Sequence, residues 1–154
     1  MKQTTLCYIE KDGAYLMLHR IKKVGDENRD KWVGIGGKLE EGESPFDCVR
    51  REVFEEVGLT LGSVSYRGII TFVSDRYGTE YMHLFHTCDF SGSVKEICDE
   101  GVPKWVKVQD VENLPIWQGD KIFLKLLSED CPFFSLKLEY EGDRLISDTL
   151  EFAK

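Results

Sequence analysis

GGKLEEGESPFDCVRREVFEEVGL, residues 36–59, is the stretch that decides the fold of this chain. It predicts a glycine loop that runs directly into a short acidic helix. Gly36 and Gly37 have no Cβ, so the backbone can bend tightly there and expose its carbonyl groups. We therefore expect a ligand to approach the chain at this loop.

The start and the end of the helix are both marked in the sequence. Ser44 supplies an N-cap hydroxyl, Pro45 has a preset φ angle, and Asp47 places a carboxylate in the first turn. Gly58 is expected to end the helix as a left-handed cap. An apolar stripe is expected to pack on a core and consists of Phe46, Val49, Val53 and Val57.

Three carboxylates share the adjoining face of this helix, because Glu52, Glu55 and Glu56 stand at i, i+3 and i+4. Glu55 and Glu56 lie in the last turn, where the helix dipole disfavours each carboxylate by roughly 0.3–1 kcal/mol. A hard divalent cation held by oxygen ligands, such as magnesium, would offset this repulsion. The alternative is a solvated acidic helix in which Arg51 pairs with Glu55.

These residues resemble a complete Nudix box, G-x5-E-x7-R-E-U-x-E-E-x-G-U with U aliphatic. Every constrained position is filled, by Gly37, Glu43, Arg51, Glu52, Val53, Glu55, Glu56, Gly58 and Leu59. A contiguous motif with this many constraints is a specific signal. The resemblance implies a hydrolase of a nucleoside diphosphate linked to a further group, folded as an α/β/α sandwich.

The resemblance also implies roles for individual residues. The metal ligands would be the Gly36 carbonyl, the carboxylates of Glu52, Glu55 and Glu56 and, from outside the box, Glu100. The metal would be Mg²⁺, with Mn²⁺ as a possible substitute. Arg51 would orient Glu52, Glu43 would support the site, and the general base would lie in the neighbourhood of Glu52 and Glu56.

Length and composition limit the class of protein. With 154 residues, 42% of them hydrophobic and 12% aromatic, the chain is long enough for one well-packed domain, residues 1–154. The balance of 20 basic against 28 acidic residues, a net charge of −8, argues against binding to nucleic acid polymers. A small anionic nucleotide would need a metal ion as a bridge.

Cysteine usage and hydropathy predict a soluble, cytoplasmic protein. We expect it to be a monomer or a weak dimer. The five cysteines are odd in number, widely spaced and lack a CxxC motif, so they indicate neither a disulfide framework nor a zinc site. The N-terminal residues form no apolar signal region. No segment reaches the about 18 consecutive apolar residues of a membrane helix.

The rest of the chain predicts an α+β fold, with the acidic helix on one face of a mixed sheet. His83 and His86 would lie on opposite faces of a strand and so make a poor shared metal site. Hairpins are expected at 4–9 with 14–19, 66–73 with 81–90, and 134–140 with 145–152. Further elements are strands at 32–35 and 104–108, a turn at 91–93 and a helix at 119–127.

Cations near the glycine loop are candidates for binding phosphate. Arg20 and Lys23 follow the first hairpin, and Lys38 follows the two glycines. Each could reach a substrate phosphate. The alternative is an ordinary solvated loop.

Beyond the box, three segments resemble MutT-like 8-oxo-dGTP diphosphatases, including small bacterial MutX-type proteins and their animal counterpart. The segments are KWVGIGGKLEEGE, LPIWQGD and PFFSLKLEYEGDRL. The resemblance implies that Trp117 and Asp120 hold the purine base, with Trp32 beside them. A carboxylate can accept from N1–H and the exocyclic amine of guanine, and an indole can stack on a base. Without the family, Trp117 reads as a core aromatic and Asp120 as a helix N-terminal charge.

Two departures stand out: Val33 replaces the asparagine and Gly119 replaces the second aspartate of the animal enzyme. The leading hypothesis is Mg²⁺-dependent hydrolysis of 8-oxo-dGTP to 8-oxo-dGMP and pyrophosphate. The alternatives are a Nudix hydrolase acting on ADP-ribose, a nucleotide sugar or a dinucleoside polyphosphate, and a ligand-binding regulator without catalysis.

Overall fold

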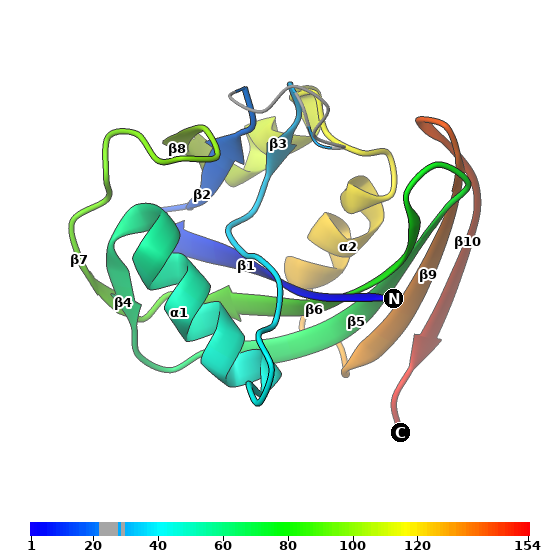
Figure 1. The fold of residues 1–154 in the computed structure, drawn as a ribbon, viewed down its shortest axis with the longest axis horizontal. Coiled ribbons are helices and arrows are strands. Elements are labelled where there is room, and N and C mark those ends of the chain that lie inside the picture. Colours follow the sequence, from blue (N-terminus) through cyan, green and yellow to red (C-terminus); the bar gives the residue numbers. More distant parts are fainter. Residues whose placement is uncertain (22–27, 29) are drawn as a thin grey trace.

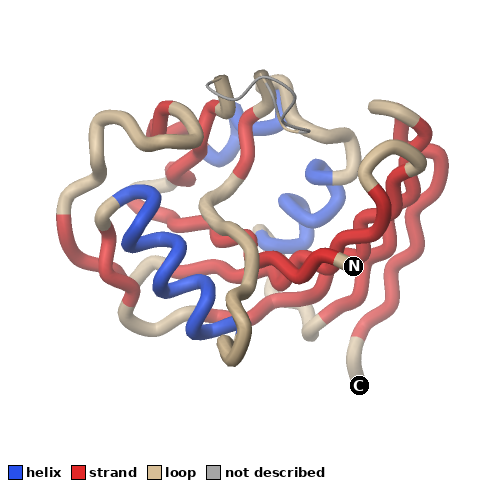
Figure 2. The backbone as a smooth tube through the Cα atoms, in the orientation of Figure 1, coloured by secondary structure: helices blue, strands red, loops and turns tan. Residues whose placement is uncertain are grey.

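The computed structural model describes residues 1–21, 28 and 30–154, and in them strands form a curved mixed sheet with helices packed against it (Figures 1 and 2). The strands are β1 Lys2–Lys11, β2 Ala14–His19, β3 Trp32–Val33, β4 Leu59–Leu61, β5 Ser65–Ser74, β6 Gly78–Thr87, β7 Phe90–Gly92, β8 Val102–Lys107, β9 Phe134–Glu141 and β10 Arg144–Phe152. The helices are α1 Pro45–Val57, the 3₁₀ helix η1 Val108–Asn113 and α2 Asp120–Leu127.

The main sheet has eight strands in the described residues, in the order β10-β9-β5-β6-β1-β2-β3, with β8 also paired to β2. The pairs β1 with β6 and β5 with β9 are parallel, whereas the hairpin pairs are antiparallel. The sheet is therefore mixed, as the sequence predicted.

The first predicted hairpin is present, but its two strands pair over only a short length. β1 and β2 are in register only at Glu10 with Tyr15 and Lys11 with Ala14, after which they diverge. The segment after β3 then takes the place of β2 along β1: the Cys7 N–H donates to the Ile35 carbonyl at 2.6 Å, and the Ile35 N–H donates back at 3.0 Å. As a result β1 lies inside the sheet, between β6 and the glycine loop.

Alternation along β1 gives the molecule two cores. Cys7 and Ile9 pack with the α1 side chains Val49, Val53 and Val57 on one face, and Tyr8 packs with Phe123 of α2 on the other. Figure 1 shows β1 passing between the two helices. This arrangement confirms the α+β class and the placement of α1 on one face of a mixed sheet.

The ends of α1 form as predicted. The Asp47 N–H donates to the Ser44 hydroxyl at 3.1 Å and the Ser44 N–H donates to the Asp47 carboxylate at 3.0 Å, which makes a capping box. Gly58 ends the helix at φ 80°. Phe46 differs from the expectation: it is 40% exposed at the edge of the core, with its ring against Tyr66 and Phe85.

Two strand predictions are wrong between the second hairpin and β8. Residues 81–90 do not form one strand, because β6 ends at Thr87, and the expected turn at 91–93 is largely β7, paired antiparallel to β4. Both β4 and β7 have three residues, which is too short for a period-two pattern to be recognised in sequence. In the described residues, no helix has the length and apolar character needed to span a membrane.

The capping box yields a first prediction. Replacing Ser44 with alanine removes the hydroxyl that accepts from the Asp47 N–H, and we expect the free energy of unfolding to fall by about 1 kcal/mol. Urea unfolding followed by circular dichroism measures this. Ser63→Ala is the control, since that exposed hydroxyl makes no hydrogen bond among the described residues. Equal stabilities for the two variants would contradict the role of the cap.

Candidate active site

The predicted site residues converge on a cavity of about 810 Å³. Its walls come from the start of β1, the glycine loop, α1, the start of β6 and the N-terminal end of α2. Predicted residues that line it are Arg20, Gly36, Lys38, Glu52, Glu56, Glu100, Trp117 and Asp120. The lining does not include four other predicted residues, Glu43, Arg51, Glu55 and Trp32. Lys23 lies outside the described residues.

The two glycines of the loop are required by close packing. A Cβ at Gly36 would lie 1.8 Å from the Thr5 carbonyl oxygen of β1, and one at Gly37 would lie 2.3 Å from the carboxyl carbon of Glu52. The Gly37 carbonyl accepts from the Thr5 N–H at 2.8 Å. No backbone hydrogen bond among the described residues uses the Gly36 carbonyl, so this oxygen remains available at the cavity wall.

Arg51 holds the acidic helix against the loop. Its guanidinium makes a bidentate pair with Glu43 at 2.7 and 2.8 Å and donates to Glu52 at 2.8 Å. It also donates to the Lys38 carbonyl at 3.0 Å. The hydrogen bonds from Arg51 lower the pKa of Glu43 to about 2, so that carboxylate stays ionised and the pair persists.

Glu55 points away from the cavity. Its side chain is 59% exposed and lies 3.2 Å from Arg51 at i+4, which is the ion pair expected of a solvated helix face. Of the three carboxylates on this face of α1, Glu52 and Glu56 therefore line the cavity and Glu55 does not.

Glu56 lies half-buried in the cavity wall. Burial, together with the nearby carboxylates of Glu100 and Glu52, raises its pKa to about 7, while a hydrogen bond from the Cys98 thiol at 3.4 Å acts in the opposite direction. Glu52 and Glu100 line the same cavity, and carboxylate oxygens are the donors that a hard divalent cation prefers. The residues present therefore fit a divalent metal ion, which would relieve the repulsion between them.

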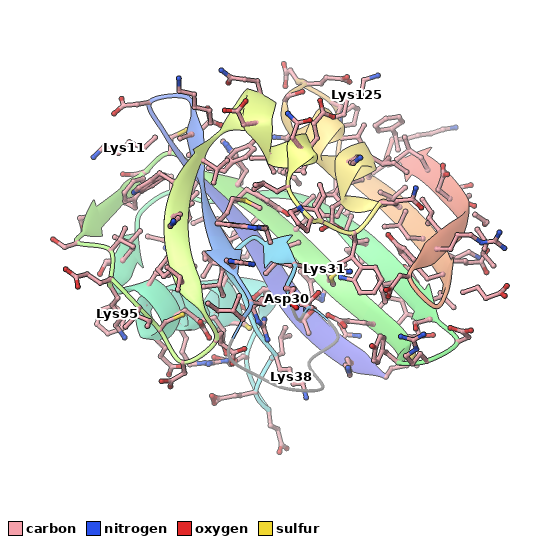
Figure 3. All side chains as sticks on the ribbon, turned by 90° about the horizontal axis from the view of Figure 1, so that it is seen from above. Lys11, Asp30, Lys31, Lys38, Lys95 and Lys125 are labelled. Atoms are coloured by element: carbon pink, nitrogen blue, oxygen red, sulfur yellow. The ribbon has the colours of Figure 1, made fainter. Side chains whose placement is uncertain are left out.

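Arg20 and Glu100 form an ion pair at 2.5 Å. The sequence assigned them different tasks, phosphate binding for Arg20 and metal binding for Glu100, and both side chains line the cavity. Lys38, labelled in Figure 3, also lines the cavity. Cationic and anionic groups are thus interleaved at this end of the cavity.

The opposite end of the cavity is aromatic and holds one buried acid. The Trp117 ring packs against Phe72 at 5.2 Å and Tyr140 at 5.0 Å between centroids, and its N–H donates to Asn28 at 2.7 Å. Asp120 is 6% exposed. Burial raises the pKa of Asp120 to about 8, although the Lys31 ammonium acts in the opposite direction.

Trp32 has a supporting position. Its ring stacks on His19, with centroids 4.5 Å apart, and its backbone N–H donates to the Pro115 carbonyl at 2.8 Å. That bond ties β3 to the segment that carries Trp117. Trp32 thus contacts the structure around the base end without lining the cavity.

Several cavity residues were missed by the sequence analysis. They are Thr4 and Leu6 of β1, Phe72 of β5, and Glu80 and Met82 of β6. Thr4 and Leu6 of β1 alternate, as do Glu80 and Met82 of β6. The register pairs Lys2 with Glu80 and Thr4 with Met82. Period-two spacing could have grouped them within a strand, but it could not show that the strands are neighbours. Lys31, whose Nζ lies 4.6 Å from the Trp117 ring centroid, was also missed.

Comparisons with known proteins agree with this arrangement. Residues 2–127 match the NUDIX domain family. The uncharacterized Nudix hydrolase YvcI of Bacillus subtilis is 32% identical over 78% of this chain and 75% of its own length. The oxidized purine nucleoside triphosphate hydrolase of Danio rerio is 29% identical over 94% of this chain and 90% of its own. A crystal structure of the MutT protein from Bacillus halodurans superposes with a TM-score of 0.86 at 28% identity, over 98% of both chains.

The family match spans most of the chain, and the fold and the box residues around the cavity agree with it. The chain therefore belongs to the Nudix hydrolase family.

Proposed function

We propose that this Nudix hydrolase is a magnesium-dependent diphosphatase of oxidised purine nucleoside triphosphates, which converts 8-oxo-dGTP to 8-oxo-dGMP and pyrophosphate. One observation carries the proposal: a single cavity has a carboxylate cluster at one end and the buried Asp120 beside Trp117 at the other. The name of the Danio rerio relative supports the substrate class.

The phosphate end supplies the chemistry. Nudix hydrolases generally need divalent metal ions, and here Glu52, Glu56, Glu100 and the Gly36 carbonyl would hold Mg²⁺, or Mn²⁺ in its place. The bound ion would neutralise the polyphosphate and activate water. Arg51 keeps Glu52 in position through its 2.8 Å hydrogen bond. Arg20, Lys38 and Lys23 are the proposed phosphate contacts, and the general base lies at Glu52 or Glu56.

The base end supplies recognition. As a carboxylate, Asp120 would accept from N1–H and the exocyclic amine of an oxidised guanine; as a neutral acid it would offer one donor and one acceptor, which matches an adenine-type edge. A pKa of about 8 makes both forms accessible near neutral pH. The Trp117 and Phe72 rings would supply apolar contact for the purine.

The Gly119 departure has a structural explanation. A Cβ at Gly119 would lie 2.5 Å from a Leu138 methyl and 2.8 Å from the Tyr140 hydroxyl, which also accepts from the Gly119 N–H at 2.7 Å. An aspartate there would require the Leu138 or Tyr140 side chain to move. Asp120 therefore carries the carboxylate recognition at this end, while Val33 lines the cavity with an apolar side chain.

A substrate panel tests the proposal directly. We expect kcat/KM for 8-oxo-dGTP to exceed that for dGTP, ADP-ribose and a diadenosine polyphosphate by about tenfold or more, a difference of about 1.4 kcal/mol in transition-state binding. Pyrophosphate release with magnesium measures this for the two triphosphates, and nucleotide product analysis for the others. Preference for ADP-ribose or the dinucleotide would leave the phosphate chemistry in place and remove the base-pocket assignment.

Glu56→Gln tests the phosphate end. Removing this carboxylate is expected to lower kcat by about 10²–10⁴-fold, the usual range for an acid–base group. The fold should persist, since glutamine has nearly the same shape and removes a half-buried charge. The control is Glu41→Gln, which alters an exposed turn in the same loop. An unchanged kcat at saturating magnesium would exclude Glu56 from the mechanism.

Asp120→Asn tests the base end, and we expect KM for 8-oxo-dGTP to rise more than kcat falls. The variant should also change the pH dependence of stability. The pKa of Asp120 is about 8 in the folded protein and about 3.9 in the unfolded chain, so the folded state binds an extra proton between these values. The stability that Asp120 contributes is thus present below about pH 4 and lost as the pH rises toward 8.

Asparagine has no such proton, so the stability of the variant relative to the parent protein should rise between pH 5 and pH 8. Steady-state kinetics and urea unfolding at several pH values measure the two effects. Asp110→Asn serves as the control, because Asp110 is also a first-turn carboxylate but is exposed. Equal KM values would count against base recognition, and parallel pH profiles would count against the buried acid.

A further inference from the structure

A second group of metal-binding side chains lies outside the cavity. Glu10, His86 and Cys88 each offer a ligand atom, and these atoms all lie within 4.8 Å of one another. The Glu10 carboxylate and the His86 Nε2 are already in contact at 2.8 Å. The group combines a carboxylate, an imidazole and a thiol, three different donor types.

The parallel pairing of β1 with β6 brings these residues together. In that register Tyr8 lies beside His86 and Ile9 beside Thr87, the last pair. Glu10 is the next residue of β1, and Cys88 is the first residue after β6, so both lie where the pairing ends, near His86. Local sequence patterns do not show this group, because His86 was paired only with His83 and the chain has no CxxC motif. Glu10 comes from a strand more than 70 residues away from His86.

The group is separate from the hydrolase site. The cavity uses Thr4 and Leu6 near the start of β1, whereas Glu10 lies at the end of that strand. Six residues of extended chain, from Thr4 to Glu10, span roughly 20 Å. Figure 1 shows β1 and β6 running side by side away from the N-terminus, and Figure 3 places Lys11, next to Glu10, far from Lys38.

Solvent reaches this group of side chains, and a buried aromatic ring packs against its imidazole. A hollow of about 380 Å³ is lined by Glu10 and Cys88 together with Lys11, Asp12 and Phe90. Cys88 is exposed. The ring of the buried Tyr15 meets the His86 imidazole edge-on, with centroids 6.2 Å apart. The imidazole is thus held in place, while the thiol has room to move.

We propose that Glu10, His86 and Cys88 form a binding site for Zn²⁺ that joins the ends of β1 and β6. Thiolate with imidazole favours zinc over magnesium, which prefers oxygen ligands. In tetrahedral coordination the ligand atoms lie about 3.3–3.6 Å apart, so no separation has to shorten by more than about 1.5 Å, which is within reach of a rotation of the exposed Cys88 side chain. Water or the Asp12 carboxylate would fill the fourth position.

Cobalt titration of the reduced, metal-free protein tests the site. Co²⁺ bound by a thiolate gives a charge-transfer band in the near ultraviolet, which carboxylate ligands do not give. Because the Cys98 thiol lies beside Glu56 at the hydrolase site, the loss of the band in Cys88→Ser, rather than the band itself, assigns it to this group. We expect the band to reach the intensity of one thiolate-bound Co²⁺ per chain and to disappear when Zn²⁺ is added. Cys88→Ser should abolish the band. His86→Ala should weaken Co²⁺ binding by about tenfold or more, because even the loss of an outer-shell partner typically lowers metal affinity by about 10–100-fold.

Cys131→Ser is the control, because Cys131 is a half-buried thiol elsewhere in the fold and should leave the band unchanged. Zinc should also raise the melting temperature of the parent and of Cys131→Ser by more than that of Cys88→Ser, in which only the hydrolase site can still bind the ion, and without metal Cys88→Ser should melt as the parent does. If His86→Ala fails to fold, Glu10→Gln replaces it. The absence of a band in the parent, or an undiminished band in Cys88→Ser, would overturn the proposal.

Discussion

The close packing of the glycine loop between β1 and α1 is the constraint on which the rest of the structure depends. The loop has room for no side chain at Gly36, because the Thr5 carbonyl would lie 1.8 Å from a Cβ. At Gly37 the obstacle would be the Glu52 carboxylate. Because the loop contacts β1 on one side and the Glu52 carboxylate on the other, it fixes the position of Glu52 relative to the sheet. Arg51 completes this arrangement by binding Glu43, Glu52 and the Lys38 carbonyl.

The loop also explains why the cavity has two unlike ends. Residues after β3 pair with β1, so β2 pairs with β1 at only two positions. The helices α1 and α2 pack on opposite faces of β1. One cavity then receives Glu56 from α1 and Asp120 from α2. Burial is the largest cause of the raised pKa in both, to about 7 for Glu56 and about 8 for Asp120. Their surroundings differ: carboxylates neighbour Glu56, which favours a cation, and Lys31 neighbours Asp120.

Local features of this fold could be predicted from the sequence, and non-local ones could not. The capping box of Ser44 and Asp47, the Gly58 cap and the separation of Glu52 and Glu56 from the apolar stripe depend on residues within a few positions of one another. The internal position of β1 depends on pairing with β6, about 75 residues later, which no local pattern shows. The sequence suggested that residue 36 is glycine so that the backbone can bend. In the structure, glycine is needed because the backbone at residue 36 packs directly against that of Thr5, which is distant in sequence.

The parallel register of β1 with β6 determines which side chains meet at both proposed sites. It sets Thr4 beside Met82 at the cavity and Tyr8 beside His86 near the proposed zinc site. A slip of one residue in β1 would turn its side chains to the opposite face. Thr4 would leave the cavity, and Glu10 would no longer meet His86. One strand pairing, held by the Tyr8 side of the core on one face and the Cys7 side on the other, therefore maintains both sites.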